Sequence, residues 1–91
     1  MKVEISCKFM SFSNRIQGTT DDGKEYDYYR LKAFFEGDNT ELSFSVRNLP
    51  SYAASIARCA SYKFGDSCKI VVDFAKSRDR NYWFCNFVEV K

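Results

Sequence analysis

Histidine is absent from this 91-residue chain, and its absence excludes several classes of site. A zinc site built from cysteine and histidine is not available, and the four cysteines lack the close spacings of a four-cysteine zinc site. The commonest general base is also missing. No Gly-x-Gly-x-x-Gly, Walker, Gly-x-Ser-x-Gly or paired-carboxylate motif takes its place. The sequence therefore predicts a protein that is not an enzyme and needs no metal or other cofactor.

Long apolar runs are missing as well. No stretch approaches the ~20 residues needed to cross a bilayer, and residues 1–5 lack the apolar core of a secretory signal. We therefore expect a cytoplasmic protein with no membrane partner. The four cysteines lie within predicted strands or a helix, which favours buried free thiols over disulfides. They are Cys7, Cys59, Cys68 and Cys85.

The sequence is instead rich in aromatic residues, which make up 18% of the chain. A chain of 91 residues corresponds to a single domain, residues 1–91, with a small core. Some of the large rings are therefore expected to face solvent or a ligand. The net charge of +2 is only mildly basic, so any attraction to phosphate must come from local clusters of lysine and arginine.

Alternating apolar and polar residues predict five β-strands. They cover residues 2–12, 25–36, 42–47, 70–74 and 82–90. The turn-forming residues 37–40 predict a hairpin between the second and third strands. Residues 13–24 are polar, contain the turn signal Asp22-Gly23 and show no periodic apolar face. They are predicted to form a long mobile loop.

One short helix is predicted between the third and fourth strands. Pro50 suits a first helical position, and apolar residues recur at helical spacing from Ala53 to Ala60. The order β-β-β-α-β-β is that of the oligonucleotide-binding (OB) fold, in which five strands close into a barrel without exposed edges. The predicted fold is therefore mainly β, a five-stranded OB-type barrel with one helix. A plain antiparallel sheet with one helix is the alternative.

The second predicted strand carries rings and cations on one face. That face holds Tyr26, Tyr28, Arg30, Lys32 and Phe34. Nucleic-acid bases stack on aromatic rings with about 1 to 3 kcal/mol each, while cations follow the phosphates, and neither contact requires a particular sequence. In the OB fold this strand belongs to the usual binding face. The alternative is that these rings pack under the loop 13–24 or against a partner subunit.

A second candidate cluster lies before the last strand. It consists of Arg78, Arg80, Tyr82 and Trp83, in the loop that borders the bound strand of an OB domain. Arg15 and Lys24, in the loop after the first strand, are expected to face this cluster across the groove. The alternative is that these charges are solvated. The carboxylates of residues 21, 22, 25 and 27 lie in or beside a polar loop, where solvation is the expectation.

Three short segments resemble the small single-stranded DNA-binding proteins of filamentous phages, plasmids and conjugative elements. They are Lys2-Val3-Glu4-Ile5, the Gly23-Lys24-x-Tyr26 entry to a strand that reaches Leu31, and the close Phe87-Val88-Glu89-Val90-Lys91. The resemblance spans most of the chain. It implies an OB barrel that coats single-stranded DNA cooperatively, often as a homodimer, during replication or transfer.

The expected function is thus non-catalytic binding of single-stranded DNA with little sequence preference and strong salt dependence. An RNA-binding OB domain is one alternative, because stacking does not distinguish the two sugars. The other is a protein-interaction or assembly module whose exposed aromatic strand docks a partner.

Overall fold

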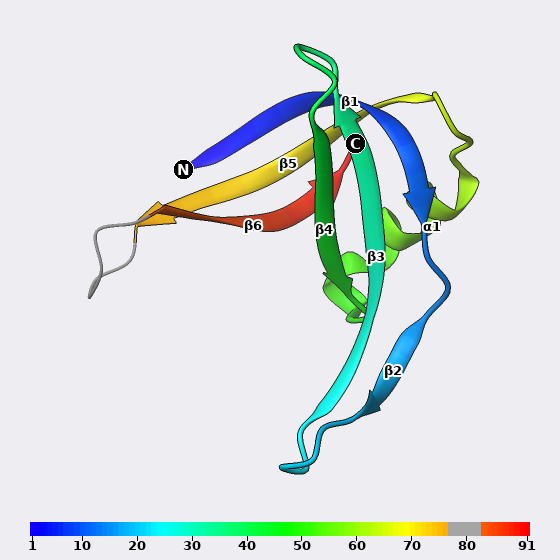
Figure 1. Ribbon diagram of the computed structural model, residues 1–91, viewed down its shortest axis with the longest axis vertical. Helices are drawn as coiled ribbons and strands as arrows, with labels where there is room; N and C mark the ends of the chain where they lie inside the picture. Colours follow the sequence, from blue (N-terminus) through cyan, green and yellow to red (C-terminus); the bar gives the residue numbers. More distant parts are fainter. Residues whose placement is uncertain (77–82) are drawn as a thin grey trace.

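The protein is a six-stranded antiparallel β-sheet with one short helix (Figure 1), as seen in a computed structural model that describes residues 1–76 and 83–91. The strands are β1 (Lys2–Phe12), β2 (Ile16–Thr19), β3 (Glu25–Phe35), β4 (Glu41–Arg47), β5 (Ser67–Lys76) and β6 (Trp83–Val90). A 3-10 turn, η1 (Pro50–Tyr52), leads into helix α1 (Ala53–Ser61). The predictions of a mainly β fold and of a helix after the β3–β4 hairpin are confirmed.

The alternation of apolar residues decides which side of the sheet is buried. Leu31 and Ala33 of β3, Val46 of β4, and Ile70 and Val72 of β5 all point into one core and are fully buried. Successive side chains of a strand point to opposite sides of the sheet, so the residues between these lie on the opposite side, which is at least partly exposed along β3 and β4 but buries Val71 of β5. We call the solvent side of β1, β3 and β4 the outer face.

Residues 13–24, predicted to be a long mobile loop, contain strand β2, so that prediction is wrong. β2 pairs with the first part of β3, from Ile16 opposite Tyr28 to Thr19 opposite Glu25. Alternation is invisible there because Ile16 is the only large apolar residue of β2. β2 forms because β3 extends past the end of β1, and the backbone groups of this extended part of β3 need hydrogen-bond partners.

The closed barrel is not confirmed, and residues 1–76 and 83–91 form six strands where five were predicted for the chain. The sheet order is β2-β3-β1-β5-β6, with β4 on the other edge of β3. Among the described residues β4 and β6 share no ladder, although the rings of Phe44 and Phe87 lie 6.1 Å apart between them. The extra strand arises because the first predicted strand continues as β2 after a break at residues 13–15.

Helix α1 covers the inner side of the sheet. Its buried Cys59 joins the core, and the Ser55 hydroxyl accepts a hydrogen bond of 3.0 Å from the backbone N–H of Val90 in β6. The helix has nine residues. In the part of the chain that the structure describes, no helix has the length and apolar character needed to cross a membrane.

All four cysteines are free thiols, and three of them are buried as predicted. Burial raises the pKa of Cys59 to about 12 and that of Cys68 to about 11, because an apolar environment disfavours the thiolate. Cys85 is exposed, which corrects the prediction for this residue. The pairing of β5 with β1 ends at Asp73, and beyond this point the β5–β6 hairpin projects away from the core (Figure 1). Cys85 lies in this projecting part, opposite Phe74.

Candidate nucleic-acid interface

The outer face of β3 carries a line of rings and cations, which we call the β3 row. It consists of Tyr26, Tyr28, Arg30, Lys32 and Phe34. The rings of Tyr26 and Tyr28 lie 6.2 Å apart, and the guanidinium carbon of Arg30 lies 5.9 Å from the centre of the Tyr28 ring. Tyr26 is 41% exposed. The five side chains therefore share one surface, as the alternation predicts, and their role in binding stays a prediction.

Gly18 of β2 leaves room for the Tyr26 ring. It lies directly opposite Tyr26, and the ring lies across it so closely that a Cβ at this position would overlap the tyrosine hydroxyl. Glycine is the residue that leaves room for such an approach. The ring thus lies against β2 at one end of the row.

Strand β4 supplies polar partners beside the row that the sequence analysis missed. Arg47 lies opposite Tyr28, and Ser45 lies opposite Arg30. Both are exposed, and the Nη1 atom of Arg30 donates a 3.4 Å hydrogen bond to the hydroxyl of Ser43. Hydroxyl and guanidinium groups are common partners of phosphate oxygens. The signal was present in the sequence, since the buried Val46 puts its neighbours on the outer face.

Strand β1 adds Lys8, another residue that the sequence analysis missed. Lys8 is exposed and lies opposite Phe34, at the other end of the row from Tyr26. The buried neighbours of Lys8 on both sides in β1 direct it to the outer face. Lys32, two residues before Phe34, lies 3.9 Å from the carboxylate of Glu41 in an exposed pair. Exposed pairs of this kind are weak, so phosphate can compete for Lys32.

A surface pocket of about 550 Å³ lies beside the two tyrosines. It lies between the first part of β3 and the end of β4. Its lining consists of Glu25, Tyr26, Asp27, Tyr28, Ser45, Arg47, Asn48 and Leu49. A volume of this size is within the range of small-ligand sites, so the pocket has room for a base.

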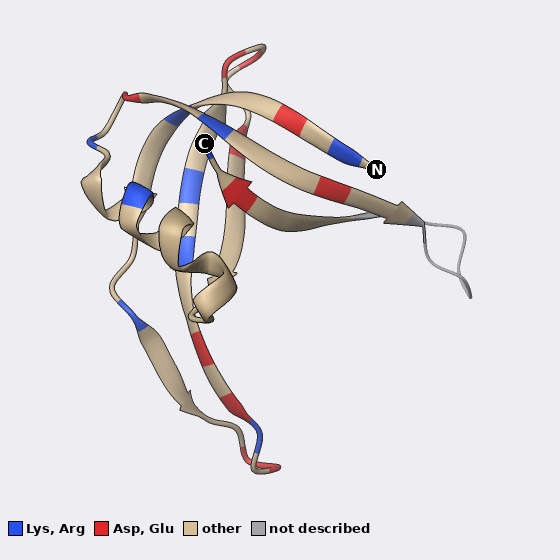
Figure 2. Ribbon diagram, turned by 180° about the vertical axis from the view of Figure 1, so that it is seen from behind, with Lys and Arg blue, Asp and Glu red and all other residues tan. Residues whose placement is uncertain are grey.

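The charge of the β2–β3 hairpin changes along its length (Figure 2). Toward the turn the acidic residues outnumber the basic ones, whereas Arg30 and Lys32 lie in the second half of β3. The acidic residues are Asp21, Asp22, Glu25 and Asp27. Phosphates are attracted to clustered cations and repelled by carboxylates. The second half of β3 is therefore the part suited to the backbone of a nucleic acid.

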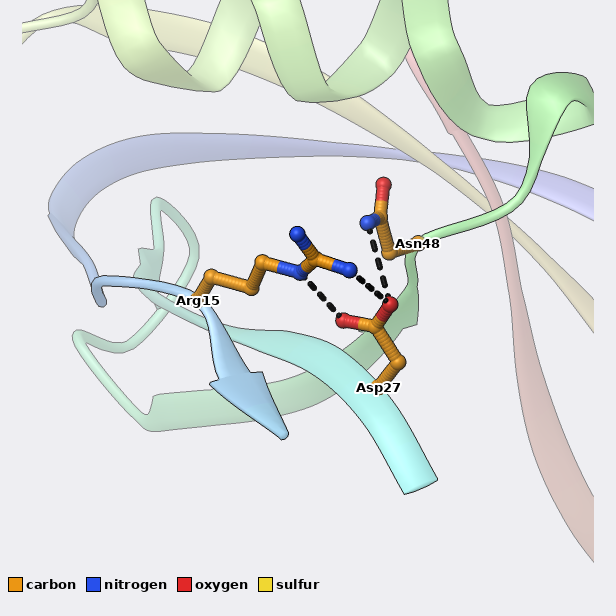
Figure 3. Close-up of polar contacts among 3 residues, drawn as sticks. All are labelled: Arg15, Asp27 and Asn48. Carbon is orange, nitrogen blue, oxygen red and sulfur yellow. Dashed lines mark hydrogen bonds and ion pairs between the residues drawn. The ribbon is translucent and has the colours of Figure 1, made fainter. Parts of the chain in front are cut away.

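Arg15 is held by Asp27 (Figure 3). Its Nε and Nη2 atoms donate hydrogen bonds of 2.8 and 2.6 Å to the two carboxylate oxygens. The Asn48 amide donates a third, of 3.2 Å. Asp27 lies between Tyr26 and Tyr28 in β3, so its side chain leaves the strand on the other side. The prediction that Arg15 faces the second candidate cluster across a groove stays a prediction, because Arg78, Arg80 and Tyr82 lie outside the described residues.

The Arg15 contact predicts the titration of Asp27. The hydrogen bonds from Arg15 lower the pKa of this carboxyl, so the contact stabilises the fold above about pH 3.9 and is lost as the pH falls through the folded pKa. In a ¹³C NMR titration we expect the Asp27 midpoint to lie below the unfolded value and to rise in Arg15→Ala. Asp22, whose pKa is lowered by Thr20, is the control and keeps its midpoint. An unchanged Asp27 midpoint in Arg15→Ala would contradict the assignment.

The remaining predicted site residues are placed only in part. Lys24 is exposed beside the acidic turn of the hairpin. Trp83 begins β6, where its backbone pairs with Lys76. Arg78, Arg80 and Tyr82 lie outside the described residues. The structure therefore brings together the residues of the first candidate cluster and leaves the second without a position relative to it.

Known proteins give no match. Neither models of protein families, nor curated proteins, nor solved structures show significant similarity to this chain. The resemblance to phage and plasmid single-stranded DNA-binding proteins therefore stays a prediction. A function for this protein must therefore be argued from the rings and cations of the outer face.

Proposed function

We propose that this protein binds single-stranded nucleic acid, DNA in the first place, without catalysis and with little sequence preference. The observation that carries the proposal is the β3 row, in which neighbouring rings and cations share one solvent-facing surface. Bases stack on the rings at about 1 to 3 kcal/mol each, and the cations follow the phosphates. Such a surface suits a protein that coats or protects exposed single strands.

The arrangement of cations favours a nucleic acid over a protein partner. Lys8, Arg30, Lys32 and Arg47 all surround the rings of the outer face. The centre of a protein–protein interface is usually depleted of charged residues. Cations beside stacking rings instead suit a single strand, whose phosphates contact the cations while its bases stack on the rings.

An OB-type barrel, open between β4 and β6, is the fold that we propose for this surface. Three features support it. β1 and β2 act as one interrupted strand that pairs with both β3 and β5, α1 lies between the two hairpins, and Phe44 and Phe87 bridge the open side. In such a fold the β3–β4 surface corresponds to the strands that bind oligonucleotides.

Salt dependence provides the first test. Each phosphate contact on a single strand contributes about −0.7 to the slope of log affinity against log salt, so four contacts give about −3. Raising the salt from about 50 to 200 mM should then weaken binding of a fluorescent oligo-dT about 50-fold, measured by anisotropy. An RNA oligomer of the same length reports the preference between sugars. If no oligomer binds at any salt concentration, the proposal fails and the interaction-module alternative is favoured.

A further inference from the structure

Phe64 is a large apolar side chain that lies outside the β3 row and is mostly exposed to solvent. It is 73% exposed and belongs to the connection between α1 and β5. Its neighbours in this connection, Lys63, Gly65 and Asp66, are exposed and present no apolar surface. The ring is therefore the only apolar side chain among residues 63–66 of this connection.

The backbone beside Phe64 is held firmly against β1. Gly65 donates a 2.8 Å hydrogen bond to the carbonyl of Phe9, and Phe9 donates one of 2.7 Å to the carbonyl of Asp66. Asp66 closes the turn, accepting a 2.8 Å bond from the Lys63 N–H and donating one of 3.0 Å to the Lys63 carbonyl. Gly65 has φ of 89°, which favours glycine. The ring is thus presented on a preorganised turn.

Phe64 continues the β3 row beyond its end. Its ring lies 6.3 Å from that of Phe34, in an edge-to-face arrangement with an interplanar angle of 84°. β1 has β3 on one side and this turn on the other, so the two rings meet above β1. The exposed Lys8 of β1 lies opposite Phe34, and Lys63 precedes Phe64. Rings and cations therefore lie side by side across β1, as they do on β3.

We propose that Phe64 is a further stacking residue for single-stranded nucleic acid, and this inference rests on the proposed function. A nucleic-acid strand that runs along β3 from Tyr26 to Phe34 spans about 27 Å, because a β-strand rises about 3.4 Å per residue. It then crosses β1 beside Lys8 and stacks a base on the exposed ring of Phe64. The rigid turn reduces the loss of conformational freedom on binding, which favours affinity.

The experiment compares wild type, Phe64→Ala and Phe64→Tyr in binding oligo-dT of increasing length, roughly 4 to 16 nucleotides, the range of sites on one OB domain. Loss of one stacked base should weaken binding of the longer oligomers by about 5- to 10-fold in Phe64→Ala. Oligomers too short to reach beyond Phe34 should bind both proteins equally. Phe64→Tyr keeps the ring and should bind as wild type does.

Two controls separate this inference from the proposed function. The thermal unfolding midpoint of Phe64→Ala should stay close to that of wild type, because the ring is mostly in solvent. If Phe64→Ala binds every oligomer as tightly as wild type does, while loss of Tyr28 and Arg30 weakens binding, the inference fails and the proposed function stands. If wild type binds no oligomer, both fail. Lower self-association of Phe64→Ala in sedimentation, with unchanged oligomer affinity, would assign the ring to a protein contact and overturn the inference.

Discussion

Replacing Tyr28 and Arg30 together by alanine is expected to lower the affinity for a single-stranded oligonucleotide by about 30- to 100-fold. The variant loses one stacking ring, which is worth about 1 to 3 kcal/mol, and one phosphate contact. Arg30 also lies over the Tyr28 ring, so the two side chains support one another. Anisotropy titrations at low salt, where wild type binds most tightly, measure the loss.

The single variants separate the two contributions. Arg30→Ala should reduce the salt slope by about 0.7, whereas Tyr28→Ala should lower affinity and leave the slope unchanged. Arg58→Ala is the matched control, because it removes an exposed cation from α1, on the other side of the sheet. It should bind nearly as wild type does. Equal binding by the double variant and wild type would remove the basis of the proposed function.

Leu31→Ala should destabilise the fold by about 2 to 5 kcal/mol, the range for a leucine in a packed core. Leu31 is among the largest fully buried side chains of the described residues and lies in the strand that pairs with β1, β2 and β4. A domain of this size has a free energy of unfolding of about 5 to 15 kcal/mol, so the loss is a large fraction of it. Urea unfolding followed by circular dichroism measures the change.

Lys32→Ala, one residue further along β3, provides the contrast. Its side chain lies on the outer face, so the free energy of unfolding should change by less than about 0.5 kcal/mol. Its affinity for oligonucleotide should fall, since one phosphate contact is lost. Opposite effects of two adjacent substitutions test the division of β3 into a core side and a binding side. Strong destabilisation by Lys32→Ala, or none by Leu31→Ala, would show that β3 is oriented differently.

Most of the strands were predictable from the sequence because their burial is one-sided. Alternation in residues 2–12, 25–36 and 42–47 matches β1, β3 and β4 within a residue or so. β2 was not predictable, because a strand with a single large apolar residue leaves no periodic signal. Closure of the sheet was not predictable either. It depends on the distance between β4 and β6, which lie far apart along the chain.

The site residues that lie on one strand were predictable from the sequence, whereas those contributed by other strands and turns were not. The β3 row follows from alternation within residues 25–36 alone. Arg47, Lys8 and Phe64 join it only through the pairing of β3 with β4 and β1 and through the turn bonded to Phe9. The contact of Arg15 with the carboxylate of Asp27 was not predictable either, because alternation within one strand does not indicate which residues of other segments meet it.

By itself the sequence determined which residues of each strand face the core, because a period of two follows from the geometry of an extended chain. It also determined that no histidine is available for a metal or acid–base site. Only the tertiary structure decided which strands are neighbours, and hence which rings and cations share a surface. Those contacts join residues distant along the chain, and their geometry depends on register, twist and turn hydrogen bonds that local periodicity does not encode.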